Sequence, residues 1–293
     1  HRALLSGVII NKFRGDIRLF EEGRRLIEEL CGLPVLGVVP YLTDVHIEEE
    51  DSVALSKRAL QAQQGKVNIA VVLLRYISNY TDFARLEQDE RVHLFYTNNV
   101  EELQEADIII VPGSKSTLAD LYELRRNGVA QAIIRAHRAG KTILGICGGY
   151  QMLTDRILDD LESGDGDAPG LGLLPGEVRF GAEKVLGRPR GTWRGEVVEG
   201  YTIHHGRVHA AEGEDFCEGQ QSGSTFGTMW HGAFESDGFR RAFLTEVAEL
   251  AGSDWRPSEG APGYAEQREA MIERLADACE EHVDVSALLE VAR

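Results

Sequence analysis

The chain has 293 residues, of which 43% are hydrophobic and 27% charged, and its formal net charge is −17. These totals are ordinary for a globular protein, and the length favours two domains. The acidic balance argues against a nucleic-acid-binding protein, because such proteins neutralise phosphates with a basic face. No apolar run approaches the roughly 18 to 20 residues that span a bilayer, and the N-terminus lacks a signal-peptide pattern.

Four scattered cysteines contain no CxxC pair, which argues against a zinc site and a disulfide scaffold. Free thiols in a reducing compartment follow, so we expect a cytoplasmic protein without a bound metal. The chain opens on His1 instead of Met, inside an apparent strand, and we interpret it as a piece of a longer protein.

The first sixty residues predict a strand, a helix and a second strand. Residues 4–11 and 34–39 are short apolar runs rich in β-branched residues, and residues 19–30 carry apolar side chains at helical spacing. This order is typical of a parallel sheet. A polar-faced helix over 47–60 and a linker over 61–65 follow.

A second alternating series begins at residue 67. Its expected strands are 67–74, 92–96, 106–111 and 142–146, and helices are expected over 117–127 and from there to about 139. Further along, the sequence predicts an acidic, glycine-rich loop over 158–170, strands over 176–180, 196–204 and 225–230, and an amphipathic helix over 264–283. The alternation predicts a doubly wound α/β fold, in which reactive groups lie at the carboxyl ends of strands.

Cys147 is the best candidate for a nucleophile. It follows the strand 142–146 in the segment GICGGYQML, where glycines flank it and a helix begins directly afterwards. A sharp strand–turn–helix elbow of this kind exposes the side chain, and the helix N-terminus favours the thiolate. The N–H of Gly148 is then placed to stabilise an oxyanion. Cys31 and Cys279 look like core residues on helices, and Cys217 lies in a polar loop without a partner motif.

A thiol nucleophile needs a general base, and His231 is the best placed histidine. It ends the strand-like run FGTMW, so it lies at the same sheet edge as Cys147. His204 and His205 compete with it. Adjacent strand residues point to opposite faces, so these two cannot both reach one site, although one of them could line the pocket.

The loop VPGSKST, residues 111–117, joins a buried strand to a helix. Its Gly113 can bring a second backbone N–H to an oxyanion. The segment is not a phosphate loop, because Ser114 and Ile109 stand where that motif requires glycine. The stretch Gly140-Lys141-Thr142 fails the same test.

These motifs together resemble class I glutamine amidotransferases and, within them, the branch of cobyric acid synthases. VPGSKST, GICGGYQML and the GTMWHGAF run carry the first likeness, while GYTIHHG (200–206) and ISNYTDF (77–83) carry the second. INKFRGD (10–16), PVLGVVPYL (34–42) and EEEDSVAL (48–55) resemble the end of that family's dethiobiotin-synthetase-like ATP domain. The resemblance implies a flavodoxin-like amidotransferase domain over 63–293, with its C-terminal helix, after a remnant of a P-loop domain over 1–62.

The resemblance also implies roles for single residues. Cys147 is the nucleophile and His231 the base, Gly113 and Gly148 supply oxyanion N–H groups, and Gln151 holds the substrate glutamine. Most relatives carry a glutamate two residues after the histidine, whereas this chain has Ala233. The third group is therefore open, with Glu235 as a guess.

Asn11 and Lys12 resemble the late nucleotide-base-recognition segment of the ATP domain. The family's phosphate loop lies upstream of any segment in this chain, so we expect no productive ATP binding and no amidation by this chain alone. ATP-dependent amidation by the isolated chain would contradict that expectation.

The implied function is glutamine-dependent amidation of peripheral carboxylates of adenosylcobyrinic acid a,c-diamide to cobyric acid, in cobalamin biosynthesis. L-glutamine and a corrinoid acid are then the substrates, with ATP and Mg²⁺ acting in the full-length enzyme. Two alternatives remain open: a glutaminase that serves another acid, such as a cell-wall lipid precursor, and an inactive regulatory or binding module.

Overall fold

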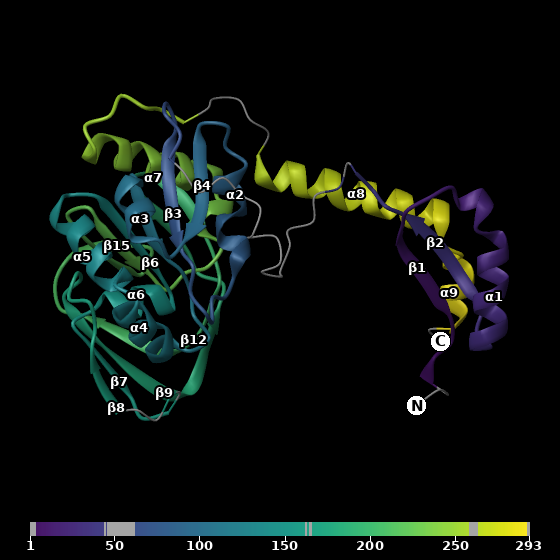
Figure 1. The fold of residues 1–293 in the computed structure, drawn as a ribbon, viewed down its shortest axis with the longest axis horizontal. Helices are drawn as coiled ribbons and strands as arrows, with labels where there is room; N and C mark the ends of the chain where they lie inside the picture. The colour runs from purple at the N-terminus through teal and green to yellow at the C-terminus, as the bar shows by residue number, and fades with distance from the viewer. Residues whose placement is uncertain are drawn as a thin grey trace. The chain divides into compact units, whose positions relative to one another are not determined.

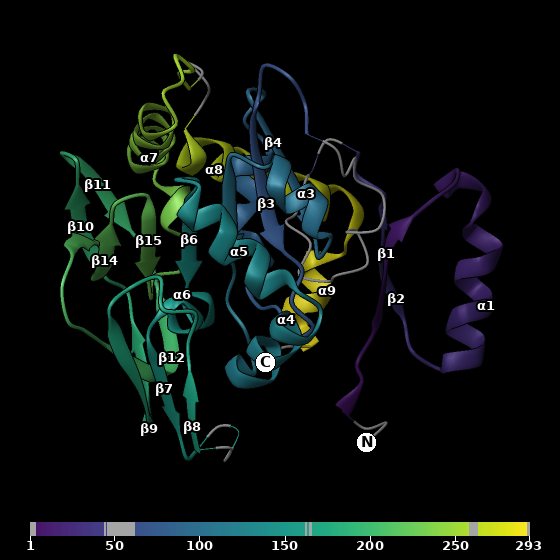
Figure 2. The same cartoon turned by 60° about the vertical axis from the view of Figure 1, so that its left-hand side comes forward.

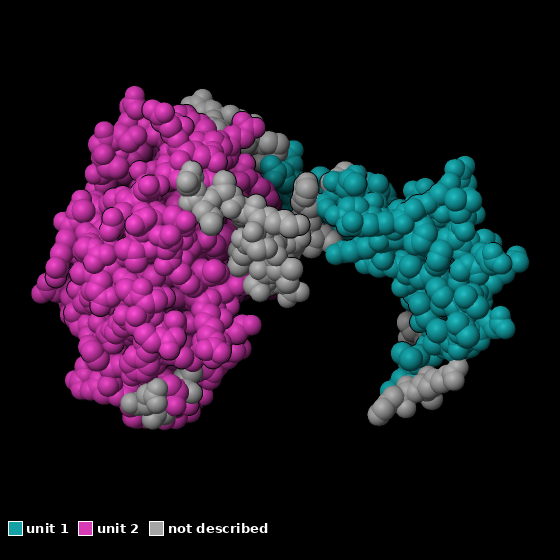
Figure 3. Space-filling view, in the orientation of Figure 1, with its two compact units in different colours: residues 1–47, 262–293 teal, residues 48–261 magenta. Residues whose placement is uncertain are grey.

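The computed structural model describes residues 4–43, 45, 62–161, 163, 166–257 and 263–291. The chain forms two compact units, one made of residues 1–47 and 262–293 and the other of residues 48–261 (Figure 3). The helix expected over 47–60 lies outside the described residues. The domain boundary expected near residue 62 stays a prediction.

The first unit contains the expected strand–helix–strand order. Strand β1 (Val8–Phe13) pairs in parallel with β2 (Val35–Pro40), and α1 (Glu21–Cys31) connects them after the short 3₁₀ helix η2 (Ile17–Leu19). The C-terminal helices α8 (Tyr264–His282) and α9 (Val285–Val291) belong to this unit.

The family resemblance predicts that the C-terminal helix belongs to the amidotransferase domain, whereas the helix packs in the first unit. The N–H of Asp284 donates to the carbonyl of Leu36 at 2.7 Å, and a Cβ on Gly37 would meet the carbonyl oxygen of His282 at 2.6 Å. The end of α8 thus packs on β2, where glycine leaves room for it. Periodicity within a helix cannot reveal a partner more than 200 residues earlier in the chain.

The second unit is built on a seven-stranded sheet (Figure 1). Five parallel strands lie in the order β4 (Val92–Thr97), β3 (Val67–Val72), β5 (Ile108–Val111), β6 (Thr142–Ile146) and β15 (Thr225–Thr228). Antiparallel strands β14 (Gly219–Ser222) and β13 (Glu214–Phe216) extend it past β15. β3 and β5 are buried along their whole length, as strands of a covered parallel sheet should be. The doubly wound α/β fold is confirmed.

Helices cover this sheet in two groups. One group packs together after β4, β5 and β6: α3 (Val100–Glu105), α4 (Thr117–Arg126), α5 (Val129–Arg138) and α6 (Gly148–Leu153) (Figure 2). The other group contains the 3₁₀ helices η4 (Tyr80–Phe83) and η5 (Ala233–Glu235) with α2 (Ala84–Glu87) and α7 (Asp237–Leu250). The chain steps one way from β3 to β4 and the other way from β4 to β5 and β6. Right-handed crossovers therefore place the two groups on opposite faces.

A four-stranded sheet flanks the main one, in the order β12 (Thr202–Ala210), β9 (Gly176–Gly187), β7 (Arg156–Asp159) and β8 (Gly166–Pro169). A hairpin of β10 (Arg190–Trp193) and β11 (Glu196–Glu199) is inserted between β9 and β12. The loop predicted over 158–170 is wrong, because β7 and β8 pair there. Ile157, Asp159 and Ala168 are buried, while Asp167 is exposed on the outer face.

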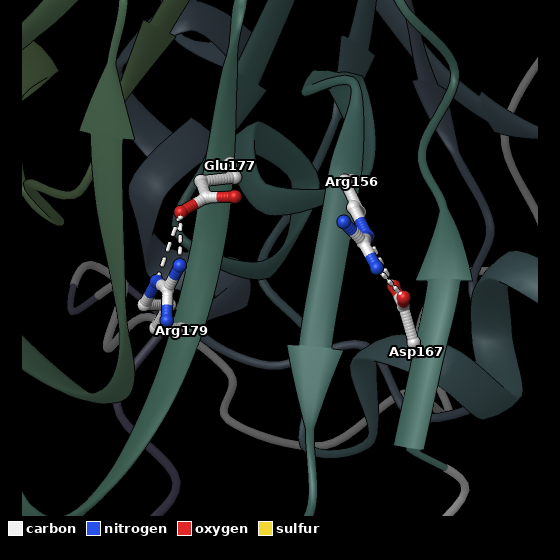
Figure 4. A network of polar contacts seen from close by, with 4 residues as sticks. All are labelled: Arg156, Asp167, Glu177 and Arg179. Carbon is white, nitrogen blue, oxygen red and sulfur yellow. Dashed lines mark hydrogen bonds and ion pairs between the residues drawn. The ribbon is translucent and has the colours of Figure 1, made fainter.

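The outward face of this small sheet carries exposed ion pairs (Figure 4). Arg156 Nε donates to Asp167 Oδ1 at 2.7 Å across β7 and β8, and Arg179 Nη2 lies 2.7 Å from Glu177 Oε1 within β9. Exposed pairs of this kind add little to stability. The sheet is held instead by its buried inner face.

Gly149 is required by packing at the start of α6. A Cβ built there would lie 1.8 Å from the carbonyl oxygen of Val111, at the end of β5. Backbone cannot move aside as a flexible side chain can, so α6 can approach β5 this closely only with glycine at this position.

We predict that Gly149→Ala lowers the free energy of unfolding of the second unit by about 3 kcal/mol or more, since overpacking against fixed backbone exceeds ordinary core strain. Urea unfolding followed by tryptophan fluorescence measures this, because Trp193, Trp230 and Trp255 all lie in that unit. Gly181→Ala is the matched control, since nothing lies within 4 Å of a Cβ there. Equal stability of the two variants would contradict the packing argument.

Candidate active site

Cys147 forms the elbow that the sequence predicts, between the end of β6 and the start of α6. Its backbone has φ 50° and ψ −111°, a strained conformation for a residue with a side chain. Its N–H donates to the carbonyl of Thr228 at 2.8 Å, which ties the elbow to β15. The residue is only 7% exposed, so Cys147 is buried and the elbow does not place its side chain in the open as the strand–turn–helix pattern predicts.

His231 lies beside this elbow. It follows β15, which pairs with β6 in parallel and in register, so the two strand ends place both residues at one sheet edge. The Cys147 side chain hydrogen-bonds the imidazole of His231, which is 1% exposed. The structure therefore brings the two residues together as expected.

Asp82 completes the arrangement. Its Oδ2 lies 2.7 Å from Nδ1 of His231, and its Oδ1 accepts the N–H of Gly232 at 2.8 Å. Both side chains are buried. Since Nδ1 faces a carboxylate, this network assigns the proton to Nδ1 and leaves Nε2 for Cys147.

Asp82 occupies the position for which Glu235 was the guess, so that guess is wrong. The carboxylate comes from η4, after β3, and reaches the histidine from 149 residues away in sequence. Asp82 belongs to the segment ISNYTDF, which carries the likeness to the cobyric acid synthase branch. A search for carboxylates after each predicted parallel strand could have found it.

The charges in this cluster favour a protonated imidazole. Burial opposes the charged form, but the Asp82 carboxylate and the Cys147 side chain outweigh it and raise the pKa of His231 to about 10. A protonated histidine next to a cysteine stabilises thiolate, which is the nucleophilic form. The same proton can then be delivered to a leaving group.

Gly113 and Gly148 lie around this pair. A Cβ on Gly113 would meet Cε1 of His231 at 3.0 Å, and a Cβ on Gly148 would meet the backbone nitrogen of Ser114 at 2.9 Å. The Gly113 carbonyl accepts the N–H of Ser78 at 2.9 Å, which fixes the loop. The N–H of Gly148 begins a helix, where it has no intrahelical partner. Both glycines are thus close enough to the elbow for the oxyanion role, which stays a prediction.

Gln151 is buried below the elbow, and its amide binds the protein itself. Its Oε1 accepts the hydroxyl of Thr117 at 3.1 Å, and its Nε2 donates to the carbonyl of Gly206 at 3.1 Å. These bonds connect α6 to α4 and β12. Whether Gln151 also holds a substrate glutamine stays a prediction.

The two competing histidines, His204 and His205, contact backbone carbonyl groups of the small sheet. His204 Nδ1 lies 2.8 Å from the Gly206 carbonyl oxygen, and His205 Nδ1 lies 3.3 Å from that of Gly181. Burial, followed by a smaller effect from the charge of His231, lowers the pKa of His204. His231 is therefore the histidine that lies beside Cys147, and its role as the base stays a prediction.

The remaining sequence candidates lie elsewhere. Asn11 and Lys12 are exposed in β1 of the first unit, where Asn11 Oδ1 accepts the N–H of Lys12 at 2.8 Å. Cys31 and Cys279 are exposed, so the core role expected of them is wrong. Cys217 lies in the turn between β13 and β14, as expected, and is buried. Within the described ranges, no three histidine, cysteine or acidic side chains form a metal-binding group, and no helix is long and apolar enough to cross a membrane.

A cysteine elbow, a buried histidine and a buried aspartate at adjacent parallel strand ends define a nucleophilic site of the acyl-transfer class. Residues 68–239 match the sequence profile of the CobB/CobQ-like glutamine amidotransferase domain. The chain belongs to this family.

Similar proteins were found over nearly the whole chain. Cobyric acid synthases of Bacteroides fragilis, Phocaeicola vulgatus and Cutibacterium acnes are 47%, 46% and 44% identical to it and cover 99%, 98% and 100% of it. The matched regions make up 60%, 60% and 62% of those proteins, so the chain spans about three fifths of their length.

Solved structures resemble the chain more distantly. A crystal structure of a glutamine amidotransferase has a TM-score of 0.49 at 19% identity and covers 63% of this chain and 98% of its own. A Thermotoga maritima PurLQS structure has a TM-score of 0.45 at 19% identity, covering 62% of this chain and 99% of its own.

We predict that Asp82→Asn lowers the pKa of His231 from about 10 toward its ordinary value near 6.5, because the carboxylate is what holds the proton on the ring. A ¹⁵N-histidine NMR titration from pH 5 to 11 measures the change, with His231→Gln used to assign the signal. Asp159→Asn is the matched control, since Asp159 is equally buried in β7. An unchanged titration of His231 in Asp82→Asn would show that Asp82 does not govern its charge.

Proposed function

We propose that this chain is the glutaminase part of a cobyric acid synthase, in which Cys147 hydrolyses L-glutamine and releases ammonia. The observation that supports this most strongly is the imidazole of His231, held between the Asp82 carboxylate and the Cys147 side chain. A nucleophile, a base and an orienting carboxylate in this order are the three parts that amide cleavage by a cysteine needs.

The first half of the reaction uses the charged pair. Thiolate Cys147 attacks the side-chain carbonyl carbon of glutamine, and the carbonyl oxygen becomes an oxyanion that the N–H groups of Gly113 and Gly148 stabilise. The C–N bond then breaks, and His231 gives its proton to the departing nitrogen, which leaves as ammonia. A thioester on Cys147 and a neutral His231 remain.

The second half restores the enzyme. Neutral His231 takes a proton from water, and the resulting hydroxide attacks the thioester carbon. The C–S bond breaks, glutamate leaves, and the Cys147 thiolate again faces protonated His231. Asp82 holds the ring throughout in the orientation that presents Nε2 to the cysteine and the water.

In the whole enzyme, we propose that the ammonia reacts with peripheral carboxylates of adenosylcobyrinic acid a,c-diamide, activated by ATP and Mg²⁺. The likeness to cobyric acid synthases over nearly the whole of this chain supports this acceptor. A glutaminase serving a cell-wall lipid precursor is less favoured, because the strand–helix–strand segment before the amidotransferase domain is shared with those relatives. An inactive module is less favoured, because all three parts of the site are present and in contact.

The N-terminus of α1 in the first unit is unsuited to ATP phosphates. The helix α1 that follows β1 opens with Glu21 and Glu22, and acidic side chains at a helix N-terminus disfavour a phosphate there. Asn11 and Lys12 could meet a nucleotide base at most. ATP is therefore proposed as a reactant of the whole enzyme, and this chain's own chemistry ends at ammonia.

We predict that 6-diazo-5-oxo-L-norleucine, a reactive glutamine analogue, labels Cys147 of the full chain, as peptide mass spectrometry would show. His231→Gln should slow labelling on the order of 10²-fold or more, because general acid–base catalysis contributes that much. Cys147→Ser should abolish the label, while Cys217→Ser, another buried cysteine, should label like wild type.

A label on another cysteine would refute the nucleophile. No label at all, with Cys147 still accessible to iodoacetamide, would refute glutaminase competence of this chain and favour the inactive module. Each variant is also treated with iodoacetamide, which does not need the glutamine-binding site. Normal alkylation with slow labelling indicates loss of substrate binding, and slow alkylation indicates loss of the thiolate.

A further inference from the structure

The ring of Tyr201 lies against the imidazole of His231. The two ring centroids are 5.3 Å apart, and the planes differ by 25°, so the rings are stacked. The main chains are paired as well: the N–H of Tyr201 donates to the His231 carbonyl at 3.0 Å, and the N–H of His231 donates back at 2.8 Å. Tyr201 therefore fixes both the backbone and one face of the ring of His231.

Asn79 in turn holds Tyr201. Its Nδ2 donates to the phenol oxygen of Tyr201 at 2.6 Å. Asn79 adopts a left-handed conformation, with φ 57° and ψ 52°, directly before η4. Its carbonyl accepts the N–H of Asp82 at 3.0 Å. One short turn thus carries the side chain that binds Nδ1 of His231 and the side chain that binds the stacking tyrosine.

The phenol is suited to a position beside a charged ring. Burial, and then the negative charge of Asp82, raise the pKa of Tyr201, so the phenol stays neutral over the working pH range. A neutral aromatic face attracts a cation, and a protonated imidazole is a flat cation that can stack on it.

A single hydrogen bond cannot fix the orientation of an imidazole. The ring of His231 could still swing about its bond to Asp82 and carry Nε2 away from Cys147. Tyr201 blocks this on one ring face, and Gly113 lies against the Cε1 edge, where a Cβ would come within 3.0 Å. Together with Asp82, these contacts define the plane of the ring.

We propose that Tyr201 is a positioning residue that stacks on His231 and keeps its Nε2 aligned with Cys147, and that Asn79 holds Tyr201 in place. This inference rests on the proposed function, since it assumes that His231 is the acid and base of glutamine cleavage. The inference gives a role to Tyr201 in the segment GYTIHHG and to Asn79 in the segment ISNYTDF. Neither residue takes part in the proposed glutamine cleavage.

The test compares Tyr201→Leu, Tyr201→Phe and Asn79→Gly in the full chain, with Tyr122→Leu, an exposed tyrosine of α4, as the control. Labelling by 6-diazo-5-oxo-L-norleucine gives a maximal rate and a half-saturating concentration. We expect Tyr201→Leu to lower the maximal rate on the order of 10- to 100-fold, since small misplacement of a reacting group costs this much. The half-saturating concentration should change less than about threefold. Tyr201→Phe and Asn79→Gly both keep the ring and lose the same hydrogen bond, so both should fall between wild type and Tyr201→Leu.

An NMR titration of His231 provides a readout that does not depend on labelling. Looser packing alone would reduce the burial that lowers the pKa of His231 and so raise it, whereas loss of the stacked ring from the cation lowers it. The pKa of His231 should fall in Tyr201→Leu and stay near wild type in Tyr201→Phe. Tryptophan fluorescence checks that each variant is folded. If Tyr201→Leu does not fold, the comparison of Tyr201→Phe and Asn79→Gly with wild type tests the proposal. The proposal would be overturned if folded Tyr201→Leu had the labelling rate and the His231 pKa of wild type. It would also be overturned if Tyr201→Leu and Tyr201→Phe lost the labelling rate equally. If wild type is not labelled but the titration shifts as expected, the proposed function fails and the positioning stands.

Discussion

The buried contact between Asp82 and His231 is the constraint on which the rest of the site depends. Two ionisable side chains lie in the interior, where each would be costly alone, and removing one partner of such a pair typically costs about 3–5 kcal/mol. The contact therefore holds η4, after β3, against the residue that ends β15. Cys147 and Gly113 follow β6 and β5, the strands between them. The ends of four neighbouring strands are thereby drawn to one point, and the sheet order alone accounts for their meeting.

Close approach of backbone gives this point its geometry. Gly149 lets α6 lie against the end of β5, Gly148 lets the elbow meet the loop after Gly113, and Gly113 lets that loop meet His231. The strained Cys147 is tolerated because β15 binds its N–H. β12 and the turn before it complete the enclosure, since Tyr201 covers His231 and Gly206 binds Gln151. The motifs that identify the family are thus the segments that must pack most closely.

The sequence could predict the parallel strands and the catalytic pair for local reasons. Continuous β-branched runs mark 67–74 and 106–111, and glycines flank Cys147 where a strand turns into a helix. Asp82 has no such local pattern, because nothing around it repeats and its partner is 149 residues away.

Glu235 is a candidate only because it lies near His231 in the chain. In β7 and β8, the glycines and acidic residues of 158–170 pointed to a loop, although Asp159 and Ala168 are buried in paired strands. α7 has a signal in the sequence, since Phe239, Phe243 and Val247 are buried at helical spacing.

The central claim is that Asp82 acts on Cys147 through His231, and a double-mutant cycle tests it most directly. The rates of Cys147 labelling by the glutamine analogue would be measured in Asp82→Asn, in His231→Gln and in the double variant. If the three residues act as one unit, the double variant should react about as fast as His231→Gln alone, because the aspartate has nothing left to orient. If the two losses multiply, Asp82 affects the cysteine independently of the histidine, and the account of the site given above is contradicted.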